Sequence, residues 1–205
     1  MSGFIVYVDG FNLYHGLHQR FRRQYLWLDL VALSRRLRPR DQLVKVRYFT
    51  AQVLNDPDAM SRQEMYLQAL QAHNGDRIEI IKGRYKAREV RCWECDATWT
   101  RYEEKETDVN IAVSLVADVA TGKATSAVII SGDSDLVPAV KMAHELNPDA
   151  DIVAAFPPER WSHDLKRLLP DSDWIRDWQI RRSLLPDEVK DPNTGYVIKR
   201  PEKWR

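Results

Sequence analysis

The sequence lacks the features that would place a protein in a membrane or outside the cell. Its two cysteines are too few for the disulfide framework of a small secreted domain. No apolar run approaches the roughly 18 residues that a membrane-spanning helix needs, and the first predicted strand starts too early to leave room for a signal peptide. We therefore expect a cytoplasmic protein that makes no membrane contact.

An excess of charge of one sign is lacking as well. The 31 basic and 30 acidic side chains leave a net charge of +1, so any binding of nucleic acid must depend on a local basic surface. A hydrophobic share of 44% in 205 residues is sufficient for the core of one ordinary domain. Composition alone therefore indicates a globular protein and does not select a partner.

Short apolar runs alternate with segments of helical pattern through most of the chain. Strands are predicted over residues 4–8, 43–49, 77–81, 128–130 and 152–156, and helices over 13–23, 30–37, 58–73, 107–120, 138–146 and 158–169. This alternation predicts an α/β fold, a central parallel sheet flanked by helices on both faces.

The last part of the chain has a different composition. Residues 170–205 mix tryptophan, proline and charge, which predicts a short helix over 174–184 followed by an irregular arm. We divide the chain into a domain of residues 1–169 and this arm, packed on the same domain. The arm either covers a sheet edge or makes a contact in a homodimer.

Two predicted strands run directly into carboxylates. Asp9 follows the first strand, and the motif Ser131-Gly132-Asp133-Ser134-Asp135 follows the strand at 128–130. Ligands gather at the carboxyl ends of parallel strands, so these side chains are expected at one edge of the sheet. Taken singly, Asp9 could be a turn residue and Asp135 a helix cap. Asn12 is expected to cap the first helix.

A third carboxylate begins the apolar face of the helix at 107–120. Asp108 starts a stripe that continues through Ile111, Leu115 and Val119. A crossover helix that leads into a parallel strand begins at the carboxyl edge of the sheet, so Asp108 is expected beside Asp9 and Asp133. Asp118, at the far end of this helix, is expected to be a solvated charge.

Carboxylates that meet at one edge repel one another, and a bound cation usually offsets this repulsion. A cluster of oxygen ligands without histidine or cysteine suits Mg²⁺ or Mn²⁺. Such ions hold phosphates and activate water. The predicted chemistry is metal-assisted phosphodiester hydrolysis, with hydrogen-bonding groups from Asn12 and Ser131 nearby. The residues expected to hold the metal are Asp9, Asp108, Asp133 and Asp135.

Three motifs together resemble the NYN family of PIN-like nucleases, in particular its bacterial branch once labelled as a domain of unknown function. They are Val8-Asp9-Gly10-Phe11-Asn12-Leu13, Glu104-Lys105-Glu106-Thr107-Asp108-Val109 and Ile130-Ser131-Gly132-Asp133-Ser134-Asp135-Leu136. The resemblance implies a Rossmann-like PIN fold and a Mg²⁺- or Mn²⁺-dependent ribonuclease that acts on single-stranded or structured RNA.

The resemblance also implies the acidic set already derived, Asp9, Asp108, Asp133 and Asp135, with Asn12 beside it. One departure concerns the second motif, which often reads Lys-Gly-Val-Asp in relatives and reads Lys105-Glu106-Thr107-Asp108 here. The added carboxylate of Glu106 either joins the metal shell or faces solvent.

A basic segment precedes the helix of Asp108. Lys82, Arg84, Lys86 and Arg88 alternate with other residues, so an extended chain places them on one face. Aromatic residues follow at Trp93, Trp99 and Tyr102. Cations for phosphates and rings for bases suit single-stranded RNA. We expect these four cations, together with Lys105 and Ser131, to contact the substrate; the alternative is a solvated surface.

Cys92-x-x-Cys95 has the spacing of half a zinc site. The remaining ligands could be His73 and His163, or the cysteine pair of a second protomer in a homodimer. The alternative is two reduced thiols in a turn packed by Trp93 and Trp99.

Two other functions fit parts of the pattern. A non-catalytic RNA-binding or regulatory module would keep the acidic site for structural reasons. A haloacid-dehalogenase-like phosphatase also has acidic strand ends, but it needs a second Asp two residues after the first, and Phe11 occupies that position here.

Overall fold

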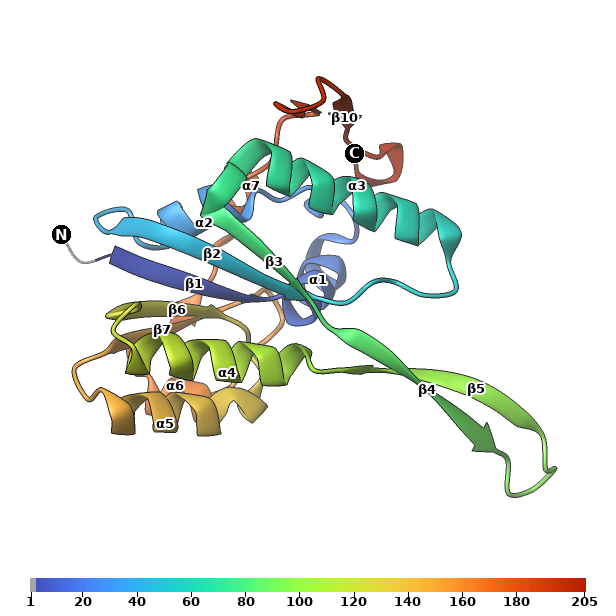
Figure 1. Ribbon diagram of the computed structural model, residues 1–205, viewed down its shortest axis with the longest axis horizontal. Helices are drawn as coiled ribbons and strands as arrows, with labels where there is room; N and C mark the ends of the chain where they lie inside the picture. Colours follow the sequence, from blue (N-terminus) through green and yellow to red (C-terminus); the bar gives the residue numbers. More distant parts are fainter. Residues whose placement is uncertain (1–2) are drawn as a thin grey trace.

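The computed structural model describes residues 3–205, apart from the side chains of Arg101, Glu103 and Glu104. Its centre is a parallel sheet of six strands in the order β3-β2-β1-β6-β7-β8 (Figure 1). The strands are β1 (Gly3–Asp9), β2 (Gln42–Thr50), β3 (Ile78–Lys82), β6 (Ser126–Ile130), β7 (Asp151–Phe156) and β8 (Asp173–Trp174). The predicted α/β fold with a central parallel sheet is confirmed.

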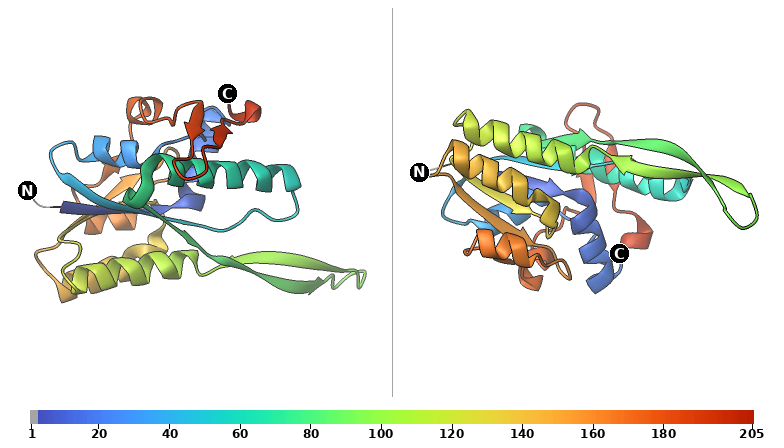
Figure 2. Two further views of the ribbon diagram at one scale, coloured as in Figure 1. Left: turned by 45° about the horizontal axis from the view of Figure 1, so that its top comes forward. Right: turned by 90° about the horizontal axis from the view of Figure 1, so that it is seen from below.

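Helices cover both faces of the sheet, as the view from below also shows (Figures 1 and 2). One layer holds α1 (Gly10–Phe21), α2 (Leu30–Leu37), α3 (Pro57–Asn74) and α7 (Asp177–Arg181). The other holds α4 (Thr107–Ala120), α5 (Val137–Leu146) and α6 (His163–Leu168). Alternation along β1 serves both layers, because Val6 and Val8 face the first core and Tyr7 faces the second. No helix among the described residues is long and apolar enough to cross a membrane.

A two-stranded hairpin is inserted between the sheet and α4. β4 (Arg84–Arg91) pairs with β5 (Thr98–Lys105) in an antiparallel ladder, and the pair extends away from the body (Figures 1 and 2). The sequence predicts an extended segment here but not the partner strand. Because the hairpin leaves after β3 and returns before α4, its root lies at the carboxyl edge of the sheet.

The C-terminal arm packs on the sheet and on the first helical layer. β8 adds to the sheet beside β7, and the small hairpin of β9 (Glu188–Lys190) and β10 (Val197–Lys199) lies on α3. The side chains that bury the arm are Ile175, Ile180, Leu185, Val189, Ile198 and Trp204. The helix predicted over 174–184 is shorter than expected, because its first residue belongs to β8.

Asp118 is a buried charge, and the expectation that it is solvated is wrong. Its carboxylate accepts a hydrogen bond of 2.8 Å from the Tyr7 hydroxyl and pairs with Arg47 Nη1 at 2.9 Å. Burial, followed by the contact with Asp118, raises the pKa of Tyr7. The position follows from helix phase, because Asp118 lies three residues after the buried Leu115 and shares its face.

We expect Asp118→Asn to lower the free energy of unfolding by about 2 kcal/mol, because Arg47 loses a buried partner and keeps only Glu79. Urea unfolding measures this change. The matched control is Glu145→Gln on exposed α5 surface, expected to stay within about 0.5 kcal/mol of the parent. Equal stability of the two variants would contradict a structural role for the buried charge.

Candidate metal centre

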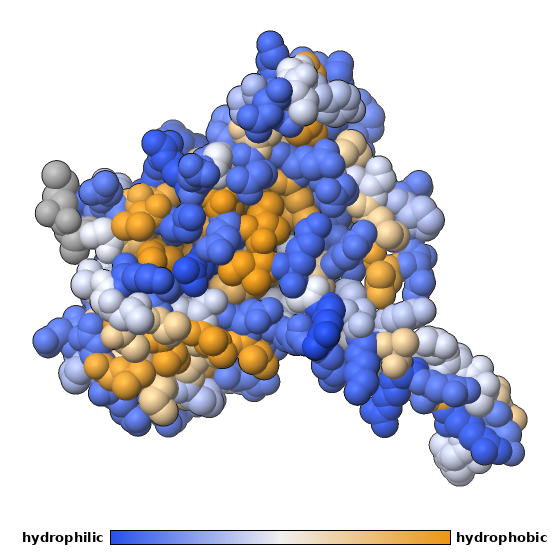
Figure 3. Space-filling view, viewed as in Figure 1, coloured by the Kyte–Doolittle hydropathy of each residue, from blue (hydrophilic) through white to orange (hydrophobic). Residues whose placement is uncertain are grey.

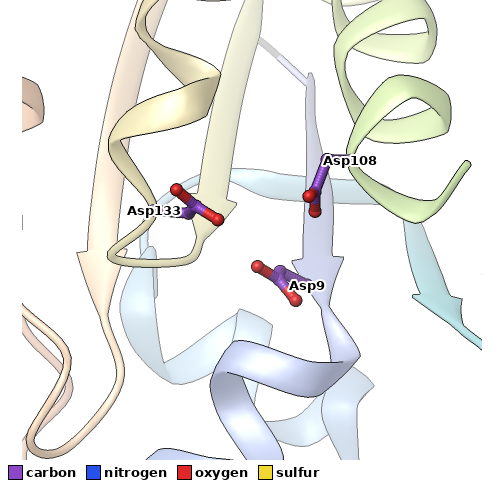
Figure 4. Close-up of side chains that lie close together, drawn as sticks. All are labelled: Asp9, Asp108 and Asp133. Carbon is purple, nitrogen blue, oxygen red and sulfur yellow. The ribbon is translucent and has the colours of Figure 1, made fainter. Parts of the chain in front are cut away.

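Three carboxylates converge at the carboxyl edge of the sheet. Asp9 ends β1, Asp133 follows β6, and Asp108 lies in the first turn of α4. Each offers an oxygen within 4.8 Å of the others, and the side chains point towards one another in Figure 4. Asp9 is buried, Asp133 half-buried and Asp108 exposed. The oxygen-only donor set and the opening to solvent on one side fit a hard divalent cation.

Hydrogen bonds hold the two strand ends of the centre together. Asp9 caps α1 by accepting the Asn12 N–H at 2.9 Å, and its other oxygen accepts the Ser131 hydroxyl at 2.8 Å. Ser131 Oγ accepts the Asp133 N–H at 3.0 Å, and Asn12 Oδ1 accepts the Gly132 N–H at 2.9 Å. The predicted cap, Asn12, is therefore not the cap; its amide instead ties α1 to the turn after β6.

Two further predicted site residues lie in this network in different ways. Ser131 is fully buried, so it positions Asp9, and the predicted contact with substrate does not fit its place. Asp135 is exposed, and its N–H donates to Asp133 Oδ1 at 2.9 Å. Its carboxylate is not in the group of three converging oxygens. A role for Asp135 in metal binding stays a prediction.

The environment of Asp9 disfavours its charged form. Burial, together with the smaller effect of the charges on Asp108 and Asp133, raises the pKa of Asp9 to about 6, against the hydrogen bonds from Asn12 and Ser131. A bound cation stabilises the ionised form of a carboxylate that is both buried and surrounded by like charge. The electrostatics therefore agree with the donor set.

The carboxylates open into a pocket of about 310 Å³ that also includes Arg160. No sequence motif marks this residue as part of the site. Arg160 Nε is buried and has no hydrogen-bond partner among the described residues, which makes it a candidate to bind an anion. The loop that carries Arg160 packs tightly on two glycines: an added Cβ would lie 2.6 Å from Arg160 O at Gly132 and 2.3 Å from Pro158 O at Gly16.

The predicted basic face is divided between two strands. Arg84, Lys86 and Arg88 share one face of β4, and Lys105 lies directly opposite Arg84 on β5. Lys82 is the last residue of β3 and pairs with Glu64 at 3.7 Å, so it belongs to the main sheet. Hydrophilic side chains gather where the hairpin leaves the body (Figure 3).

Glu106 takes part in the hairpin root and not in the acidic cluster. Its carboxylate accepts a hydrogen bond of 2.6 Å from Arg84 Nε. Its φ of 81° lies in the left-handed region that favours glycine, which accounts for the glycine expected in relatives at this position. The ion pair with Arg84 helps to offset the cost of a side chain there.

The two cysteines lie at the tip of the hairpin. The N–H groups of Cys95 and Glu94 hydrogen-bond to the Cys92 sulfur and lower the pKa of that thiol. No third His, Cys, Asp or Glu joins the pair among the residues that the structure describes, so His73 and His163 are not partners. Trp93 and Trp99 are 88% and 50% exposed, and Cys95 is exposed as well, so the alternative of two thiols packed by both rings does not describe this turn.

The raised pKa of Asp9 predicts a pH-dependent cost of folding without metal. The folded state keeps the proton to a higher pH than the unfolded state, so ionisation between about pH 4 and pH 6 lowers the stability of the parent. Asn can still cap α1 and does not ionise. We therefore expect the free energy of unfolding of Asp9→Asn to rise by about 2 kcal/mol relative to the parent as the pH increases over this range. The measurement is urea unfolding in EDTA at several pH values.

The control for this exchange is Asp56→Asn, which replaces the carboxylate that caps α3. A stability difference between Asp9→Asn and the parent that stays constant from pH 4 to pH 8 would contradict the assigned electrostatics.

Comparison with known proteins places this centre in a family. The chain is 30% identical over 172 residues to a Pseudomonas putida (strain DSM 28022 / S16) protein named 6-hydroxy-3-succinoylpyridine 3-monooxygenase HspA, a match that covers 67% of this chain and 54% of that protein. The chain thus spans about half the length of this curated relative. A family model for the NYN domain matches residues 4–170. Because that match includes both strand ends and the helix that bring the carboxylates together, the chain belongs to the NYN family of PIN-like domains, which are generally nucleases.

Proposed function

We propose that the protein is a Mg²⁺- or Mn²⁺-dependent endoribonuclease. The observation that carries this proposal is the convergence of Asp9, Asp108 and Asp133 within 4.8 Å in a nuclease family. These three side chains would hold the cation, and Asp135 would act through water from its place beside Asp133. When bound, the cation supplies Lewis acidity, which withdraws charge from the phosphodiester and makes water more acidic.

The chain's own residues would orient the reaction. Ser131 and Asn12 keep Asp9 and the turn of Asp133 in register, so the carboxylates need not reorganise when substrate binds. Arg160 would donate to a non-bridging phosphate oxygen, since it lines the pocket and its Nε is unpartnered among the described residues. Water attacks phosphorus, one ester P–O bond breaks, and the leaving oxygen takes a proton to become a hydroxyl group.

Contacts with the rest of the RNA would come from the hairpin. Arg84, Lys86, Arg88 and Lys105 lie on a face that begins at the same edge as the carboxylates. A strand bound there would reach the metal centre without crossing the body of the protein. Lys82 would contribute from the end of β3. Contacts of this kind depend on salt concentration and carry little sequence information.

A second candidate function follows from the relative, whose name describes oxygenation of a pyridine derivative. Such a reaction would consume O₂ and two electrons with two protons from a reductant, place one oxygen atom on the ring and release the other as water. The match at 30% identity is the observation in its favour, but it covers only 54% of that protein. Hydrolysis of RNA is favoured because the converging carboxylates belong to the part that matches the nuclease family.

The first test is cleavage of a labelled single-stranded RNA by the purified protein in EDTA, then with Mg²⁺, then with Mn²⁺. We expect cleavage only with metal. Asp108→Asn and Asp133→Asn should lower kcat/KM by about 100-fold or more, as loss of a charged group in a reaction centre does. Asp135→Asn should have a smaller effect. The control is Asp149→Asn, an exposed carboxylate in the turn before β7.

Each alternative has its own outcome in this assay. RNA that is bound but not cut with either metal would support the non-catalytic binding module. Release of phosphate from a small phosphomonoester without RNA cleavage would support the phosphatase. Loss of 6-hydroxy-3-succinoylpyridine that needs O₂ and a reductant would support the oxygenase. Full activity of Asp108→Asn would contradict a role for Asp108 in the metal centre.

We also propose that Cys92 and Cys95 bind zinc together with the same pair of a second protomer, because zinc prefers tetrahedral thiolate sites and one chain supplies half of them. We expect one zinc ion per two chains and a dimer in solution. Cys92→Ser with Cys95→Ser should lose both, whereas Asp96→Asn in the same turn should keep both. Elemental analysis and light scattering measure these quantities; a zinc-free monomer under reducing, zinc-supplemented conditions would contradict the site.

A further inference from the structure

A second hollow adjoins the metal centre. It has a volume of about 400 Å³ and shares Phe11 and His15 with the pocket of the carboxylates. These two side chains lie one turn apart on α1, directly after the strand end that carries Asp9. A ligand fixed at the carboxylates can therefore extend past α1 into this hollow.

The floor of the hollow is aromatic. Tyr48, Tyr66 and Trp204 line it and are each 8% exposed. The rings of Tyr48 and Tyr66 lie edge to face at 6.4 Å, and those of Tyr66 and Trp204 at 5.9 Å. The Tyr66 hydroxyl donates to Leu28 O at 2.8 Å, so this ring offers its carbon atoms to a ligand. The floor suits a flat ligand with an apolar face.

The mouth of the hollow combines a further ring with positive charge. Tyr14 on α1 is 43% exposed at this opening. Arg23 and Arg62 also line the hollow, together with Asp56, and neither guanidinium is in an ion pair among the described residues. Aromatic faces beside unpaired guanidinium groups are the surroundings in which proteins hold nucleotides, with stacking on the base and charge on the phosphate.

We propose that this hollow binds the nucleobase next to the scissile phosphate, with Tyr14 and Phe11 against the base and the guanidinium groups on the adjacent phosphate. The proposal rests on the proposed ribonuclease function and adds a determinant of substrate position to it. The hollow would make cleavage depend on a base at one position of the RNA. The hairpin, in contrast, would hold the backbone without regard to sequence.

The experiment uses an RNA series in which one nucleotide at a time lacks its base. For the parent protein, we expect kcat/KM to fall by about 5- to 100-fold when the missing base adjoins the cleaved bond, and little elsewhere. Tyr14→Ala should lower cleavage of the intact RNA by a similar factor and should remove most of the penalty for the missing base, because the two changes delete one contact. The matched control, Tyr196→Ala, removes another exposed ring, 67% exposed and far along the chain, and should behave like the parent.

A binding measurement separates this inference from the proposed reaction. In EDTA, 5′-AMP and 5′-UMP should bind the parent more tightly than ribose 5-phosphate, and Tyr14→Ala should lose the difference. Base-dependent binding in a protein that cuts no RNA would support base binding in the hollow and would contradict the proposed ribonuclease activity. Two outcomes would contradict base binding in the hollow and leave the ribonuclease activity supported. One is cleavage that tolerates a missing base equally at every position; the other is an unchanged penalty for the missing base in Tyr14→Ala.

Discussion

Repulsion among the carboxylates of Asp9, Asp108 and Asp133 is the constraint that the rest of the site depends on. The fold brings them together at the end of β1, in the turn after the neighbouring strand β6, and in the first turn of α4, which packs on β1 and β2. Two layers of buried side chains supply the stabilisation that opposes the repulsion. Two hydrogen bonds then hold the strand ends together: the Ser131 hydroxyl donates to Asp9, and the Gly132 N–H donates to Asn12 Oδ1. A site under such repulsion needs rigid supports, which explains why its members come from central elements.

The positions of these three carboxylates could be predicted because their signals are local. A strand end is visible in a few residues, as at Asp9 and Asp133, and helix phase is visible in the apolar stripe that Asp108 begins. Arg160 carries no such signal, because its place is set by a loop that packs on Gly132 and Gly16, distant in sequence. Trp204 likewise reaches the hollow beside α1 only through the packing of the C-terminal arm.

Charge was the least reliable local signal. Asp118 looks like an ordinary charge at a helix end, yet Arg47 and Tyr7 arrive from two strands and make its burial possible. From the sequence, Glu106 could be an addition to the acidic cluster, yet its carboxylate accepts a hydrogen bond from Arg84 at the hairpin root. In both cases the deciding partner lies many residues away, so a single stretch of sequence cannot distinguish a buried pair from a solvated side chain.

The distribution of charge at the carboxyl edge gives the proposed reaction two separate electrostatic requirements. At the centre, three carboxylates would repel a phosphodiester, so the proposed substrate would approach only when a cation had reversed the local sign, with Arg160 beside it. On the hairpin, the cations are exposed and, in the proposed function, would attract the RNA backbone whether or not metal is present. Salt screens exposed charges much more than buried ones. Binding along the hairpin would therefore be governed by salt and entry into the centre by metal, and neither can replace the other.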